Sequence, residues 1–424
     1  MSIVARDLAP EARIPRCQSC SSLLSRTFVD LGLQPLANSY VRIDHAEDPE
    51  PRFPLHARVC DACLLVQVDT IQRPEDIFVD YAYFSSYSES WLKHCREYAD
   101  QMVERFGLTS ESRIVEIASN DGYLLKYFVA KGMRVLGVEP AANVAQRAIQ
   151  HGVPTDIAFF GVQSARRLAD AGWSADLLAA KNVLAHVPNI NDFVAGIRLM
   201  LKPDGVFTVE FPHLLNLIRD VQFDTIYHEH FTYLSLVALC PIFERHDLSI
   251  FDVEKQPTHG GSLRLYVASS EAGRIRSARV KAVLDEEQAA QLDRPIGYVG
   301  FEPKVQAVRR EVLDFLAAAR AQGNRVVAYG AAAKGNTLLN YCGVTPDDIE
   351  FAVDRNIEKQ GRLLPGSHIP VEPVEALIEA RPDFVFILPW NLRDEIISQL
   401  PEVAAWGGNF VTAIPTLQIH SGAH

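Results

Sequence analysis

One stretch near the middle of the chain constrains the fold more than any other feature. Residues 113–117 form a short apolar run typical of a buried parallel strand, residues 118–122 break that run, and an apolar-periodic helix is expected to start near Tyr123. A strand, a tight turn and a helix in this order open a doubly wound α/β domain. We therefore predict an α/β fold whose ligand site lies at the carboxyl ends of parallel strands.

The same stretch indicates a cofactor. Small residues in the turn let a ligand approach the backbone, and the helix N-terminus offers N–H groups without partners. Glu116 sits at the strand end, where S-adenosylmethionine (SAM) enzymes place an acidic residue, and a second strand, 135–138, ends in Glu139, which suits a ribose. Ala118 and Asn120 replace two glycines of GxGxxG, so an ordinary crossover remains the alternative. The candidate SAM contacts are Glu116, Ala118, Asn120, Gly122, Glu139, Phe160 (for adenine) and Asn182.

Composition narrows the class of protein. The chain has 424 residues, is 48% hydrophobic and carries a formal net charge of -12, as expected for a soluble enzyme of two or three domains. An acidic chain is a poor partner for nucleic acid, because phosphate binding needs an excess of Lys and Arg. No apolar run is long enough to span a membrane, and residues 1–16 lack the apolar core of a secretion signal, so a cytoplasmic location is expected.

Four cysteines predict a metal site. Cys17 and Cys20 form one CxxC pair, and Cys60 and Cys63 form another about 40 residues later. Two such pairs can close one tetrahedral Zn²⁺ site of four thiolates, with no open position for water, so the zinc is expected to be structural. The segment between the pairs must then carry a small structure of its own, and a redox pair or unpaired thiols are the alternatives.

Several polar segments are candidates for substrate chemistry. Tyr81 and Tyr83 lie in a stretch rich in Tyr, Ser and Trp that suits a lid over a polar ligand or, equally, an aromatic staple between domains. Asn182 and His186 follow the predicted fourth strand, 176–180, and should face the reaction centre. Residues 258–264 hold a glycine loop that could present N–H groups to an oxyanion, or be a plain β-turn.

The most unusual cluster is residues 227–230, with the sequence Tyr-His-Glu-His. Tyr227 and His230 are three residues apart and can face the same side of a helix, whereas His228 and His230 cannot. Metal binding is one interpretation, but the spacing is not that of a zinc-binding helix. General-base catalysis fits better, because a histidine has a pKa near neutrality and a carboxylate such as Glu229 can tune and orient it.

The last third of the chain predicts a second nucleotide fold. A helix at 305–322, a strand at 325–329 and the turn that starts at Gly330 repeat the strand–turn–helix order. Asp354, about 20 residues after the turn, fits an NAD ribose. Lys334, inside the turn, suits a diphosphate.

Taken together, the motifs resemble those of the sugar-nucleotide C-methyltransferases that act on 4-keto deoxysugars, such as the 3-C-methyltransferases. The likeness covers nearly the whole chain. It rests on the four cysteines and on five segments in order: EIASNDGYLL from Glu116, NVLAHVP from Asn182, YHEHF from Tyr227, HGGSLR from His259 and GAAAKGNTLLNY from Gly330. The resemblance implies a zinc-binding module over residues 1–75, a SAM-dependent methyltransferase domain over 76–298 and a Rossmann-like domain over 299–424 that holds the sugar nucleotide.

The resemblance also implies a reaction. A base removes the proton at C3, next to the ketone at C4, and the enolate carbon then attacks the methyl group of SAM, with donors stabilising the enolate oxygen. By this likeness His230 is the base, Tyr227 and Glu229 are alternates or orienting partners, and His186 contacts the keto oxygen directly or through a water. The expected contacts of the dTDP- or GDP-linked sugar are one of Tyr81 and Tyr83, together with His259, Gly260, Ser262, Lys334, Asn336 and Asn391. C5 methylation stays open, and a monomer or small homo-oligomer is expected.

Three alternatives from other classes remain. An NAD-dependent sugar-nucleotide oxidoreductase or epimerase would use the turn at Gly330 with Asp354, but would leave Glu116 and the 227–230 cluster without a role. A zinc-binding adaptor would need an exposed docking face, which the sequence does not indicate. A tRNA or protein methyltransferase would share SAM, but the acidic composition argues against RNA.

Overall fold

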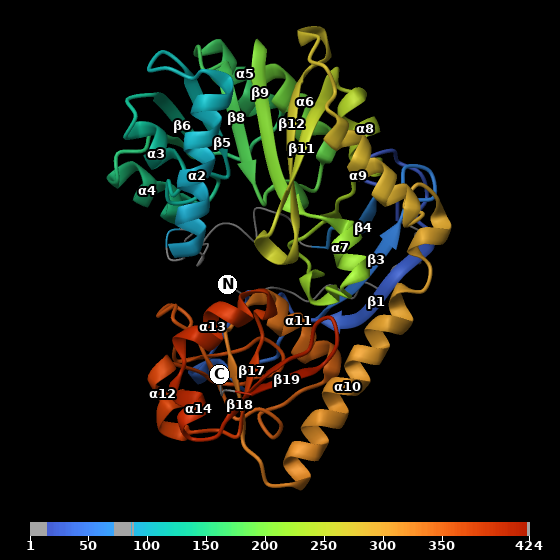
Figure 1. Ribbon diagram of the computed structural model, residues 1–424, viewed down its shortest axis with the longest axis vertical. Helices are drawn as coiled ribbons and strands as arrows, with labels where there is room; N and C mark the ends of the chain where they lie inside the picture. The colour runs from blue at the N-terminus through green and yellow to red at the C-terminus, as the bar shows by residue number, and fades with distance from the viewer. Residues whose placement is uncertain (1–14, 72–85, 87–88, 422–424) are drawn as a thin grey trace.

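The computed structural model describes residues 15–71, 86 and 89–421. Its central sheet has seven strands in the order β11–β12–β9–β8–β5–β6–β7 (Figure 1). Their bounds are β5 Arg113–Ile117, β6 Arg134–Val138, β7 Thr155–Asp156, β8 Ala175–Lys181, β9 Leu201–Pro212, β11 Leu248–Gln256 and β12 Ser262–Ser269. The strands from β9 to β7 are parallel, and β12 and β11 add an antiparallel edge.

Helices cover both faces of this sheet, as the doubly wound prediction requires. They are α2 Glu89–Phe106, α3 Leu125–Val129, α4 Ala142–Gln150, α5 Val162–Asp170, α6 Ile190–Met200, α8 Leu236–Glu244 and α9 Ala278–Ala289, and α7 Leu214–Arg219 follows β9. One buried apolar cluster lies on each face of the sheet, because a strand with neighbours on both sides must bury both its faces. Helix α3 begins two residues later than the sequence predicts, since the N–H of Gly122 bonds the Ser119 carbonyl and extends the turn.

The C-terminal domain has a second sheet, with the order β16–β14–β13–β17–β18–β19. Its strands are β13 Val326–Tyr329, β14 Ala352–Val353, β16 Val371–Glu372, β17 Phe384–Ile387, β18 Asn409–Thr412 and β19 Gln418–Ser421, all parallel except β19. Its helices are α10 Phe301–Ala321, α11 Ala333–Cys342, α12 Val374–Ala380, α13 Arg393–Gln399 and α14 Glu402–Ala405. The prediction of a second Rossmann-like domain is confirmed.

The N-terminal module joins the other two parts. Its antiparallel sheet has the order β1–β3–β4–β10, in which β1 is Arg26–Gln34, β3 is Phe53–Val59 and β4 is Val66–Val68. The fourth strand, β10 (Thr232–Tyr233), comes from the middle of the chain, and β2 (Val41–Arg42) pairs with β15 (Arg362–Leu363). In Figure 1 the blue strands lie beside both larger domains. The Phe28 ring stacks on that of Phe301 with centroids 4.5 Å apart, so the module and α10 share one core.

Candidate active site and metal centre

A cavity of about 530 Å³ opens at the carboxyl ends of the central parallel strands. Its walls come from all three parts of the chain: the turns after β5, β6 and β8, the segment 225–234, the start of α11, and Asn38 of the N-terminal module. The volume lies in the range of small-molecule sites. Ten of the residues singled out from the sequence line it: Ala118, Asn120, Glu139, Phe160, Asn182, His186, Tyr227, Glu229, His230 and His259, with Lys334 as an eleventh.

The turn after β5 has the backbone conformation of a glycine-rich turn, although Ala118 and Asn120 replace two of the glycines. Ala118 and Asn120 have φ of 53° and 49°, in the left-handed region that glycine adopts most easily. Gly122 has φ of 80°, and a Cβ there would lie 2.9 Å from the Val153 side chain, so this position needs glycine for packing. Gly122 lies outside the cavity wall, whereas Ala118 and Asn120 line it.

The two predicted carboxylates lie at different depths. Glu139 lines the cavity and accepts the N–H of Asn120 (3.0 Å) and of Ala141 (2.9 Å), which ties the turn after β6 to the turn after β5. Burial raises the pKa of Glu139. Glu116 is fully buried behind the turn, next to Tyr123, and does not line the cavity; burial raises its pKa well above the ordinary value. Glu139 is therefore placed to meet a ribose from the cavity wall, whereas Glu116, also predicted as a SAM contact, does not reach the cavity.

His230 and Tyr227 form a hydrogen-bonded pair at the cavity wall. The Tyr227 hydroxyl lies 2.7 Å from Nε2 of His230, and Nδ1 of His230 lies 2.9 Å from the Thr225 carbonyl. A carbonyl only accepts, so Nδ1 carries the proton and Nε2 accepts from the phenol. Burial and the neighbouring His186 hold the pKa of His230 well below its ordinary value, so the imidazole is neutral. A neutral imidazole with an accepting nitrogen is the form that a general base requires.

The other side chains near His230 point in two directions: His186 and Glu229 line the cavity, whereas His228 does not. The His186 ring lies against that of His230 with centroids 4.6 Å apart, and burial lowers the pKa of His186 to about 4. Glu229 faces the cavity, but it bonds Asn38, whose Nδ2 donates to its two oxygens at 2.8 and 2.9 Å. The acceptor that orients His230 is therefore the Thr225 carbonyl rather than the expected carboxylate. His228 turns away from the cavity and bonds the Pro54 carbonyl at 3.2 Å.

Only part of the expected sugar-nucleotide set reaches the cavity. His259, with φ of 55°, lines it and pairs through Nε2 with Nδ2 of Asn182 at 2.9 Å. Lys334 also lines it, with its Nζ bonded to Oδ1 of Asn391; burial lowers the pKa of Lys334, and the nearby Asp224 opposes that effect. Four predicted residues do not line the cavity: Gly260, Ser262, Asn336 and Asn391.

These four residues have other contacts. The Ser262 hydroxyl donates to the Thr258 carbonyl at 2.9 Å and closes the glycine loop. Asn336 donates to the Ala37 carbonyl at 2.7 Å and so fastens α11 to the N-terminal module. Gly260 packs against the Trp390 ring. Tyr81 and Tyr83 lie outside the described residues.

Sequence reasoning missed two groups of residues around the cavity. Asn38 is 191 residues from Glu229, and nothing in the sequence signals that contact. Lys181 lines the cavity and is paired with the buried Glu210, which also bonds Arg264 at 2.6 Å and His94 at 2.8 Å. Burial disfavours the charge on Glu210, but its three basic partners outweigh burial and hold its pKa well below the ordinary value. The partners of Glu210 lie 29 to 116 residues from it in the sequence, so no local pattern marks this cluster.

In the C-terminal domain, the turn that follows β13 is bonded by side chains of the protein itself, at the place where the sequence suggested a nucleotide. Asp354 accepts the N–H of Ala331 at 2.7 Å and that of Asn356 at 2.8 Å. Nζ of Lys359 lies 3.7 Å from the same carboxylate and donates to the Ala331 carbonyl at 2.7 Å. The acidic residue expected to bind a ribose thus braces its own turn.

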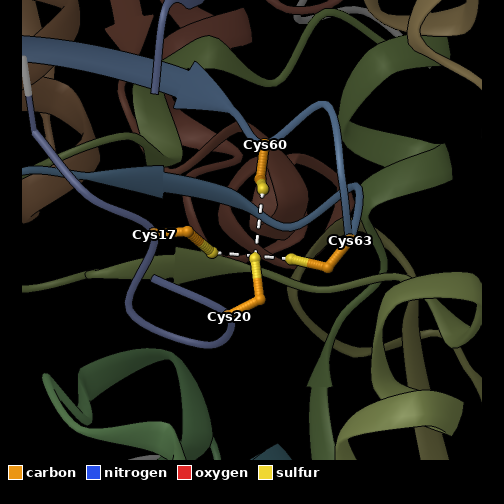
Figure 2. A group of neighbouring side chains, drawn as sticks. All are labelled: Cys17, Cys20, Cys60 and Cys63. Atoms are coloured by element: carbon orange, nitrogen blue, oxygen red, sulfur yellow. Dashed lines mark hydrogen bonds between the residues drawn. The ribbon is translucent and has the colours of Figure 1, made fainter. Parts of the chain in front are cut away.

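The four predicted zinc ligands converge at one point (Figure 2). Two tight turns, at 17–20 and 60–63, direct their sulfurs toward one another, with Cys17 and Cys63 3.5 Å apart and Cys20 and Cys60 also 3.5 Å apart. All four sulfurs lie within 4.8 Å of one another. Tetrahedral Zn²⁺ with bonds of about 2.3 Å needs sulfurs about 3.8 Å apart, so the cluster fits the metal. Gln67 donates to the Cys17 sulfur at 3.2 Å, a contact that orients metal ligands.

A doubly wound sheet, a turn of small residues beside an acidic strand end and a cavity at the carboxyl ends of the strands together fit a SAM-dependent methyltransferase. Models of three domain families match in order: a zinc binding domain at residues 17–78, a methyltransferase domain at 91–253 and a C-methyltransferase C-terminal domain at 257–415. The chain is 36% identical over 408 residues to the C-methyltransferase NovU of Streptomyces niveus, covering 96% of this chain and 97% of the relative. It therefore belongs to the C-methyltransferase family that contains NovU.

Other similarities are confined to part of the chain. A ubiquinone biosynthesis O-methyltransferase of Azorhizobium caulinodans is 31% identical over 121 residues, which are 26% of this chain and 47% of that protein. The magnesium protoporphyrin IX methyltransferase ChlM of Synechocystis, solved with SAM, is 12% identical to this chain, with a TM-score of 0.34 over 48% of this chain and all of that one. The predictions of SAM and zinc as cofactors are confirmed, and the NAD-dependent alternative is not favoured. Among the described helices, none has the length and apolarity needed to cross a membrane.

Proposed function

We propose that this C-methyltransferase transfers a methyl group to C3 of a nucleotide-linked 4-keto-deoxysugar, with dTDP- or GDP-sugars as the substrate class. The observation that carries the proposal is the neutral Tyr227–His230 pair, with its tautomer fixed by the Thr225 carbonyl, in the same cavity as Ala118, Asn120 and Glu139. C-methylation next to a ketone needs such a base, because the carbon acid is weak and its proton must leave before the carbon can attack.

In this proposal the proton from C3 passes to the Tyr227–His230 pair. Nε2 of His230 accepts the proton, directly or through the Tyr227 hydroxyl that lies 2.7 Å away. The Thr225 carbonyl holds Nδ1–H in place and stabilises the imidazolium that forms. The electron pair of the broken C–H bond moves into the enolate, and its negative charge falls on the oxygen at C4.

Two groups of the cavity wall are suited to oxygens of the substrate, His186 to the enolate oxygen and Lys334 to the diphosphate. The low pKa of His186, about 4, keeps this imidazole neutral, so it can act as an N–H donor without giving up its proton. Lys334 is a buried amine on the same wall, suited to the diphosphate of the substrate. Donors that are already oriented in a water-poor site stabilise charge as it develops.

SAM, when bound, supplies a methyl group on a positive sulfur, which makes a metal unnecessary for the transfer. The residues proposed to hold it are Ala118 and Asn120 at the bend, Glu139 at the ribose and Phe160 at the adenine. The enolate carbon forms the new C–CH₃ bond as the S–CH₃ bond breaks, so the products are the branched sugar and a neutral thioether. Glu116 is buried near the end of β5, just before the turn at 118–122.

The test uses a panel of 4-keto dTDP- and GDP-sugars with SAM, and mass spectrometry of the products. We expect a gain of one methyl group, at C3, for at least one member. His230→Gln should lower the rate of transfer by about 10²–10⁴-fold, the usual contribution of a general base, while SAM binding by calorimetry stays within about twofold. In D₂O, the wild type should also exchange the C3 proton of that sugar, and the variant should not.

His228→Gln is the matched control, because this histidine bonds Pro54 outside the cavity. It should retain turnover. Normal turnover by His230→Gln would refute the base assignment, and methyl transfer to oxygen or to no 4-keto sugar of the panel would refute the substrate class.

A further inference from the structure

The carbonyl that orients His230 lies in a short irregular turn. Thr225 belongs to the 3-10 turn η4 (Phe223–Thr225), which is not part of any sheet. Inside the turn, the Thr225 hydroxyl donates to the Gln222 carbonyl at 2.7 Å and the N–H of Ile226 bonds Phe223 at 2.9 Å. A single turn of this kind is weakly cooperative on its own, so the direction of its carbonyls depends on what packs around it.

The C-terminal domain holds this turn on both sides of Thr225. Before it, the carboxylate of the fully buried Asp224 accepts the indole N–H of Trp390 at 2.7 Å. After it, the Ile226 carbonyl accepts the hydroxyl of Thr337, from α11, at 3.2 Å. These two side chains belong to segments more than 100 residues further along the chain, and each bonds a residue adjacent to Thr225.

Trp390 is itself fixed by two neighbours of the cavity. The ring belongs to η8 (Trp390–Leu392), and Nζ of Lys334 lies 4.6 Å from its centroid. On another side it meets the loop η5 (Thr258–Gly260): a Cβ on Gly260 would lie 2.5 Å from the ring. Gly260 is thus needed for the close approach of Trp390, which explains the glycine without a contact to substrate.

We infer that Trp390 and Thr337 are positioning residues for methyl transfer: by holding Asp224 and Ile226 they aim the Thr225 carbonyl, which fixes the tautomer and direction of His230. The C-terminal domain then completes the base as well as forming part of the cavity. This inference rests on the proposed role of the Tyr227–His230 pair. It gives the contact between the two large domains a catalytic consequence, because a shift of about 1 Å in a catalytic group can cost about 10²-fold in rate.

The test measures the His230 imidazole directly, with no substrate present. Full-length protein labelled with ¹⁵N-histidine is examined by long-range ¹H–¹⁵N NMR, and the His230 signals are identified by their loss in His230→Gln. The wild type should show the Nδ1-protonated tautomer. Trp390→Phe removes the indole N–H, and Thr337→Val removes the hydroxyl at nearly constant volume; each should shift the signals toward a mixture of tautomers.

Kinetics on the 4-keto sugar nucleotide gives a second measurement. Both variants should lower kcat by about 10- to 100-fold, with KM and SAM affinity changed by less than about threefold. Trp406→Phe is the matched control, because it removes an indole N–H bond to the Pro382 carbonyl in the same domain, away from the cavity.

Unchanged His230 signals and unchanged kcat in Trp390→Phe and Thr337→Val would overturn the inference. If either variant fails to fold, the other still decides. Turnover that survives in His230→Gln would instead overturn the base assignment, so the two failures are distinguishable.

Discussion

The buried carboxyl of Glu229 predicts a pH-dependent stability that can be calculated from its surroundings. Its side chain is 3% exposed, and burial raises its pKa from 4.5 to about 7, although the donors of Asn38 oppose the rise. At about 1.4 kcal/mol per pKa unit, ionised Glu229 therefore costs the folded state about 3 kcal/mol. The substitution Glu229→Gln removes that ionisation while keeping the shape of the side chain.

The sign follows from the protons bound in each state. Below pH 4.5 the carboxyl is protonated in the folded and unfolded chains, so it costs nothing. Between pH 4.5 and about 7 the folded chain binds more protons, so stability falls as the pH rises, and above about 7 the full cost remains. Relative to Glu229→Gln, the wild type should therefore lose about 3 kcal/mol of unfolding free energy between pH 4 and pH 8.

Urea unfolding, followed by tryptophan fluorescence at several pH values, measures this difference. Glu379→Gln, on the exposed side of α12, controls for the loss of one carboxylate. Parallel stability curves for the wild type and Glu229→Gln over this pH range would refute the reasoning, because they would mean that Glu229 is not desolvated.

Two further predictions concern the metal and the substrate. The wild type should contain about one zinc per chain by mass spectrometry of the metal, and Cys17→Ser or Cys60→Ser should lose it together with stability, whereas Cys240→Ser, outside the cluster, should keep it. A stable, metal-free wild type would contradict this. Lys334→Ala should weaken dTDP-sugar binding by about tenfold and SAM binding by less than about twofold in calorimetry. Lys281→Ala, on the surface of α9, is the control, and equal losses for both ligands would exclude the diphosphate role.

The parts of the site that lie close together in sequence were predictable. The bend at 118–122 and the carboxylate at Glu139 follow from the strand–turn–helix order, because the chemistry of such a turn is local. The four cysteines came from two short motifs whose ligand geometry is set by zinc itself. The order of the motifs along the chain indicated a methyltransferase family. The 36% identity to NovU over 96% of this chain agrees with that family.

Contacts between distant segments could not be predicted. The pair Asn38–Glu229 joins the N-terminal module to the middle of the chain, and Trp390–Asp224 joins the middle to the C-terminal domain. Each of these residues is an ordinary polar or aromatic residue in a segment without periodicity, so nothing local marks its partner. The same limit applied to Asn336, which faces the N-terminal module instead of the cavity.

What the sequence determined by itself was the chemistry available: thiolates for a metal, a bend for SAM and an imidazole beside a phenol. What only the tertiary structure decided was which of these groups meet and in which protonation state. His228 and His230 are chemically identical and two residues apart, yet one bonds Pro54 and the other bonds Thr225 and Tyr227. The reason is physical: a histidine tautomer is set by the acceptor opposite each ring nitrogen, and those acceptors are placed by packing between parts of the chain that the local sequence does not relate.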